Sequence, residues 1–174
     1  MTGSRSRGVF LLTAAAVLAV DRISKTVVTG AMHLHQSVDV AGDWVRLTYI
    51  HNRGAAFGLF PGSRWFLIAV SVLAAAIVVR AAWRGGRPRI MVPLGLILGG
   101  AVGNLIDRVR RGEVVDFLDV GLGAHRWPVF NAADSAVTIG VAWLAVAVLF
   151  GRSDREESTV GGRDAHLAAP GDDG

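Results

Sequence analysis

The chain has 174 residues, a length typical of one domain; 52% of them are hydrophobic and 18% are charged. This composition is too apolar for an ordinary soluble domain, and the charges lie between long apolar runs, as they do in membrane proteins. The formal charge of +4 comes almost wholly from arginine. No basic face forms on a soluble element, so we expect no nucleic-acid partner. Cysteine is absent, which excludes disulfides, a thiol nucleophile and a Cys-type zinc site.

The chain starts with a short basic stretch and an apolar run, followed by Asp21, Arg22 and Lys25. Taken alone, residues 5–20 resemble a secretory signal peptide. Further apolar segments follow, and the charged continuation does not fit a discarded leader. We therefore predict a retained first membrane span over residues 9–29.

Residues 30–63 form a polar section that contains glycine. Within it, residues 38–40 and 45–49 alternate in polarity, with a Gly42-Asp43 turn between them. This pattern predicts a small hairpin or curved sheet. Trp44 and Tyr49 suit an interface between lipid and water.

Three more apolar segments are long enough to cross a bilayer. We predict spans over residues 64–83, 90–108 and 132–150. In the third span, Gly95, Gly99 and Gly103 recur every fourth residue, which leaves one helix face without side chains. Such a face lets a neighbouring helix approach closely in lipid, and it could also leave room for an extended substrate peptide. We expect residues 151–174 to be a disordered tail, because they lack a periodic apolar pattern.

Four crossings place the end of span 1, the start of span 2, the end of span 3 and the start of span 4 on one side. The connection between spans 2 and 3 carries Arg80, Arg84, Arg87 and Arg89. By the positive-inside rule this connection is cytoplasmic. Both termini are then cytoplasmic, and residues 30–63 are extracytoplasmic together with the polar groups at the span ends.

Two acids on this outer side, Asp116 and Asp134, are candidates for catalysis. Two carboxyl groups about 3 Å apart tend to share one proton, as in aspartic proteases. Such a pair can hydrolyse a peptide with water and without a metal. A structural interpretation is also open, because Asn131 and Asp134 have the spacing of a capping box. Asp116 could equally pair with Arg110 or Arg111.

Other polar residues near the span ends have two interpretations as well. Asn104, Asp107 and Arg108 have the spacing of one helix face. An amide and a guanidinium there can bind a peptide backbone or a carboxylate, or the three can be a polar helix end with Asp107 paired locally. Asp21 and Lys25 are four residues apart, which favours an intrahelical ion pair that anchors span 1 at the interface.

The residues alone leave other functions open. A small transporter could use intramembrane Asp and Arg as a relay, although here the charges gather at one face. A non-catalytic scaffold could bind a partner helix at its glycine row. His51 and His125 lack the spacing of a zinc motif, so we expect no metal or cofactor.

Five motifs occur in order along the chain. They are Asp21-Arg-Ile-Ser24-Lys25, Asn52-Arg-Gly54-Ala-Ala56-Phe57-Gly58, Gly99-Gly-Ala-Val-Gly103-Asn104-Leu-Ile-Asp107-Arg108, Val115-Asp116-Phe117 and Phe130-Asn131-Ala-Ala133-Asp134. Together with the span layout over about residues 9–150, this set resembles the lipoprotein signal peptidase (signal peptidase II) family. One departure is Arg22, where the family commonly has glutamine, and it weakens any specific role for that position.

The fold class that we expect is an all-α membrane protein with four transmembrane helices. The resemblance adds a small extracytoplasmic β-cradle between helices 1 and 2, in a single peptidase domain over residues 1–150. It implies a catalytic pair at Asp116 and Asp134. It implies substrate contacts at Asn52, Gly54, Asn104, Arg108 and Asn131, with Asp21, Lys25 and Asp107 in support.

The resemblance also implies the activity. The enzyme would be a membrane-embedded aspartic endopeptidase that removes the signal peptide of diacylglyceryl-modified bacterial prolipoproteins and cuts just before the lipidated cysteine. We expect its partners to be these substrates and membrane lipids, and we expect a monomer. The location implied is the bacterial cell membrane, with the active site on the extracytoplasmic side.

Overall fold

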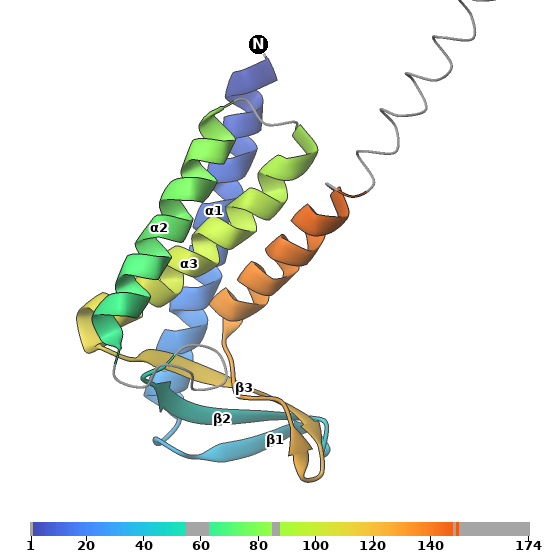
Figure 1. Ribbon diagram of the computed structural model, residues 1–174. Helices are drawn as coiled ribbons and strands as arrows, with labels where there is room; N and C mark the ends of the chain where they lie inside the picture. Colours follow the sequence, from blue (N-terminus) through green and yellow to red (C-terminus); the bar gives the residue numbers. More distant parts are fainter. Residues whose placement is uncertain (1, 55–62, 85–87, 148, 150–174) are drawn as a thin grey trace, which may run out of the picture.

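The computed structural model describes residues 2–54, 63–84, 88–147 and 149. In chain order the elements are α1 (Thr2–Ala31), β1 (Ser37–Ala41), β2 (Val45–Asn52), α2 (Arg64–Trp83), η2 (Pro88–Ile90), α3 (Met91–Arg111), β3 (Val114–Leu122), β4 (His125–Arg126) and a C-terminal helix (Ala132–Ala147). The helices run side by side, with the sheet across one end and the N-terminus at the other (Figure 1). The predicted tail 151–174 and the motif residues Phe57 and Gly58 lie outside the described residues.

Within the described ranges, two of the predicted spans are helices long and apolar enough to cross a membrane. They are α2, which matches the predicted 64–83, and the continuous run Pro88–Arg111. The C-terminal helix is apolar but shorter over its described part. α1 begins at Thr2 rather than at residue 9, and charged residues interrupt its second half. On α2, Leu73 is 61% exposed, and outward-facing apolar surface of this kind suits lipid rather than water.

α3 lies at the centre of the bundle and packs against both α1 and α2. Its glycines explain how closely the neighbouring helices approach. A Cβ atom added at Gly99 would lie 2.6 Å from the carbonyl oxygen of Ala14 on α1, and one added at Gly100 would collide with the carbonyl oxygen of Ala133. The close helix approach predicted from the glycine row is therefore confirmed. The idea that this row leaves room for a substrate is wrong, because α1 fills the space.

The sheet is antiparallel with the strand order β1-β2-β3-β4. β1 and β2 come from the predicted hairpin section, so that prediction is confirmed. β3 and β4 come from the segment between α3 and the C-terminal helix, and the sequence analysis did not predict them. α3 ends at Gly112, whose φ of 82° is left-handed, and this ending lets the chain turn back into β3. In the register of β2 and β3, Asp116 pairs with Ile50.

Two apolar clusters hold these elements together. One joins the three labelled helices around Phe10, Val78 and Leu94. The other joins the end of α1 to the sheet through Val28, Tyr49, Val115 and Phe117. The interfacial position predicted for Tyr49 is therefore wrong, because its ring is buried in this cluster. Because Val115 and Phe117 are both buried there, the intervening Asp116 is held in a fixed position relative to the helices.

We expect Gly99→Leu to reduce the free energy of unfolding by about 1–3 kcal/mol or more, since α1 and α3 must move apart to admit the side chain. Thermal unfolding in detergent micelles measures this. Gly8→Leu is the matched control, because a Cβ atom at Gly8 has nothing within 4 Å. An equal unfolding midpoint in the two variants would contradict the packing described for α3.

Candidate active site

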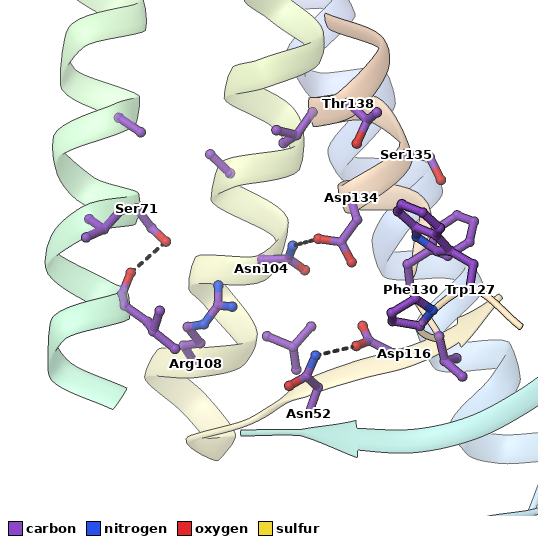
Figure 2. A pocket seen from close by; sticks show the side chains of 18 of the residues that line it. Asn52, Ser71, Asn104, Arg108, Asp116, Trp127, Phe130, Asp134, Ser135 and Thr138 are labelled. Carbon is purple, nitrogen blue, oxygen red and sulfur yellow. Dashed lines mark hydrogen bonds between the residues drawn. The ribbon is translucent and has the colours of Figure 1, made fainter. Parts of the chain in front are cut away.

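Asp116 and Asp134 face the same cavity, which has a volume of about 720 Å³. α2, α3, β3 and the C-terminal helix all contribute to its walls. The carboxyl groups reach into it from β3 and from the first turn of the C-terminal helix (Figure 2). The polar and aromatic residues of its lining include Asn52, Ser71, Asn104, Arg108, Trp127, Phe130, Ser135 and Thr138.

Asp116 is almost fully buried, with 1% of its surface exposed. Its carboxyl oxygens accept hydrogen bonds from Asn52 Nδ2 at 2.9 Å and from Asn131 Nδ2 at 2.6 Å. These amides, and not Arg110 or Arg111, are its partners among the described residues. Burial, assisted by the charge of Asp134, raises the pKa of Asp116 to about 7, although the two amide hydrogen bonds oppose the rise.

The side chain of Asp134 both caps a helix and faces the cavity. Its backbone N–H donates to Asn131 Oδ1 at 3.0 Å, and the N–H of Asn131 donates to Asp134 Oδ2 at 3.2 Å. This reciprocal pair is the predicted capping box. The other carboxyl oxygen accepts a 2.7 Å hydrogen bond from Asn104 Nδ2. Asn131 therefore contacts both acids, and capping does not withdraw Asp134 from the cavity.

The three polar residues at the end of α3 do not share one environment. Asn104 and Arg108 line the cavity. Arg108 Nη2 donates to the carbonyl oxygen of Gly54 at 3.2 Å, and the N–H of Gly54 donates to Asn52 Oδ1 at 2.9 Å. Asp107 is buried against α1 instead, so the predictions of a common face and of local pairing are wrong for it.

A buried charge cluster joins α1 to α3 beside the cavity. Lys25 Nζ lies 2.9 Å from Asp21 Oδ1, which confirms the predicted intrahelical pair, and 2.8 Å from Asp107 Oδ2. The exposed fractions of Asp21 and Lys25 are 0% and 3%. The pair therefore ties two helices together, whereas the sequence analysis placed it as an anchor at the interface.

Arg22 completes this cluster, although the sequence analysis assigned it no specific role. Its guanidinium lies 2.7 Å from Asp21 Oδ2 and 2.7 Å from Asp107 Oδ1. One signal was available in the sequence. An arginine within an apolar helix has to be paired with an acid. The two acids of the cluster, Asp21 and Asp107, are balanced only when Arg22 is counted as a cation together with Lys25.

Comparisons with known proteins identify the family of this chain. Residues 13–150 match the family described as Signal peptidase (SPase) II. The lipoprotein signal peptidase of Moorella thermoacetica is 45% identical over 152 residues, which cover 84% of this chain and 98% of that protein. The lipoprotein signal peptidase of Syntrophus aciditrophicus is 42% identical over 147 residues, covering 80% and 91%.

A solved structure shows the same fold. It is a bacterial membrane enzyme determined by the in meso method at 2.3 Å resolution. It superposes with a TM-score of 0.79 at 32% sequence identity, covering 84% of this chain and 91% of the other. The chain therefore belongs to the signal peptidase II family of membrane peptidases.

Proposed function

We propose that this protein is an aspartic endopeptidase that removes the signal peptide from diacylglyceryl-modified bacterial prolipoproteins, cutting just before the lipidated cysteine. The observation that carries the proposal is the pair of acids on one cavity, the buried Asp116 and the half-buried Asp134, which Asn131 connects. The substrate class follows from the names of the relatives.

The two acids have different roles in this proposal. Asp134 lies in the first turn of a helix, where the dipole favours negative charge, and Asn104 donates to it. Asp116 has its pKa raised to about 7 by burial, with the charge of Asp134 adding to the rise, so it can carry a proton near neutral pH. Asp134 is then the general base and Asp116 the general acid.

Hydrolysis proceeds in two balanced steps. Asp134 takes a proton from water as the water oxygen attacks the scissile carbonyl carbon, and Asp116 gives its proton to the carbonyl oxygen. In the second step the C–N bond breaks, Asp134 returns its proton to the leaving nitrogen, and Asp116 recovers one from a hydroxyl of the intermediate. The products are a carboxylic acid and an amine.

The remaining polar groups of the cavity orient the peptide. Asn52 and Asn104 line the cavity with side-chain amides. Gly54 and Asn131, the other two predicted substrate contacts, are buried and hold the neighbouring groups instead: Gly54 contacts Asn52 and Arg108, and Asn131 contacts both acids. The guanidinium of Arg108 carries five N–H donors, and its contact with Gly54 uses one of them. A second N–H of Arg108 can hold a substrate carbonyl. Correct placement of the scissile bond contributes to the rate alongside the acid and base.

The proposal also includes a membrane arrangement. Four spans cross the bilayer, both termini are cytoplasmic, and the sheet with the acid pair lies on the outer side. Residues 1–150 act as a single peptidase domain, as a monomer and without a cofactor. The apolar signal peptide lies among the helices while the lipid chains of the substrate stay in the bilayer.

We expect Asp116→Asn and Asp134→Asn each to reduce cleavage of a diacylated model prolipoprotein by about 100- to 10,000-fold, because each removes an acid–base group. Purified protein in lipid–detergent mixtures and mass spectrometry of the products measure this. Asp119→Asn is the matched control, since Asp119 lies on the same strand and pairs with Arg126 outside the cavity. It should cleave at the normal rate, and the unmodified prolipoprotein should stay intact. Normal turnover by both Asp116→Asn and Asp134→Asn would rule out the proposed chemistry.

The pH dependence of the turnover number, kcat, gives a second test. Activity should fall as the pH rises through about 7, because Asp116 then loses its proton; the apparent value belongs to the acid pair as a whole. Asn52→Ala removes a hydrogen bond that favours the ionised form of Asp116. This substitution should raise the pKa of Asp116 and so move the fall in activity to a pH about one unit higher.

Arg53→Ala is the control for the pH experiment. Arg53 follows Asn52 in the chain but pairs with Glu113 on the surface, so its removal should leave the fall in activity at the same pH. A fall in activity that does not move in Asn52→Ala would contradict the assignment of Asp116 as the acid.

A further inference from the structure

Lys25 is a buried cation next to the acid pair, and it has no role in the proposed proton transfers. Its side chain is absent from the lining of the cavity among the residues described. Its ammonium group contacts three oxygens, which are Asp21 Oδ1 at 2.9 Å, Asp107 Oδ2 at 2.8 Å and Asn104 Oδ1 at 3.0 Å. The contact with Asn104 is a hydrogen bond from the ammonium, and the contacts with Asp21 and Asp107 are ion pairs.

The contact with Asn104 determines which way that amide points. An asparagine side chain can exchange its oxygen and nitrogen by a half turn. With the oxygen toward Lys25, it also accepts from Asn131 Nδ2 at 3.1 Å, and its nitrogen donates to Asp134 Oδ1 at 2.7 Å. The reversed amide would place a donor against the ammonium and an acceptor against the carboxylate. Both changes are unfavourable.

We propose that Lys25 is a positioning residue for the acid pair: it fixes the amide orientation of Asn104 and thereby keeps an N–H donor on Asp134. This inference rests on the proposed function of the same site. Lys25 acts through Asn104 and touches neither the substrate nor the reacting atoms.

Arg22 is a natural comparison because it binds the same two acids. It lies against Asp21 and Asp107 and donates to the backbone oxygen of Gly103 at 3.3 Å, rather than to the side chain of Asn104. The two cations therefore both balance the charge of the acids, but of the two only Lys25 contacts the side chain of Asn104, whose oxygen also accepts from Asn131 Nδ2.

The test compares two double variants that keep the cluster neutral. Lys25→Met/Asp107→Asn removes the cation that contacts Asn104. Arg22→Met/Asp107→Asn removes the other cation and the same acid charge, and it keeps Lys25 between Asp21 and Asn104. The readouts are kcat and KM for a diacylated model prolipoprotein and the thermal unfolding midpoint of each variant.

We expect kcat of the Lys25 double variant to fall about 30-fold or more below that of the Arg22 double variant. KM should change less than kcat, because the donor that is lost acts on Asp134 and Lys25 itself does not line the cavity. Lys25→Arg, which keeps a cationic donor, should recover part of kcat. Equal kcat values in the two double variants would overturn the role of Lys25, as would a loss that merely follows the unfolding midpoint.

A further variant covers the case in which the Lys25 double variant does not fold. In Asn104→Asp the ionised side chain has no N–H donor for Asp134, so kcat should fall about 100-fold. Full activity of Asn104→Asp would overturn the inference. The proposed peptidase function and the positioning role of Lys25 can be tested separately. If the unsubstituted protein cleaves the substrate and Asp116→Asn does not, the proposed function stands whatever the Lys25 variants show.

Discussion

The placement of two carboxyl groups on one cavity, one buried (Asp116) and one half-buried (Asp134), is the constraint on which the rest of this structure depends. A buried acid is unfavourable unless hydrogen bonds compensate its lost hydration. Asp116 and Asp134 each receive such bonds from side-chain amides, which come from β2 (Asn52), α3 (Asn104) and the start of the C-terminal helix (Asn131). Because no single element carries all three donors, the acids can be held only when the sheet and the helices are assembled around them.

The glycine face of α3 contributes to this assembly at a distance from the cavity. By admitting α1 closely at Gly99 and Gly103, it brings the Asp21–Lys25 turn against Asp107 and Asn104. The resulting charge cluster is balanced, and Asp21, Lys25 and Asp107 are buried in it while Arg22 is half-buried. Buried ion pairs add little net stability over apolar packing, yet breaking one is costly because it leaves a charge unpaired. We infer that the cluster serves to hold one arrangement of α1 and α3, and with it one orientation of Asn104.

Asp134 shows why local sequence patterns have more than one meaning. The capping box formed with Asn131 is a structural device found at many helix starts, and in this protein it is present in full. The same box orients the second oxygen of Asp134 toward Asn104 and the cavity. A structural and a chemical interpretation of one residue are therefore compatible, since a carboxylate has two oxygens and the cap uses only one.

The sequence by itself determined the local elements. α2 lies at its predicted position, the hairpin and the helix-packing glycines are where the patterns indicate, and the family follows from five motifs in register. Hydrophobic periodicity reports which residues are buried but not which partner they meet. That Asp107 turns toward α1, that Arg22 bridges two acids, and that Asn131 connects Asp116 to Asp134 were decided only by tertiary structure. So was the strand β3, because its pairing with β2 joins segments that lie on opposite sides of two helices in the chain.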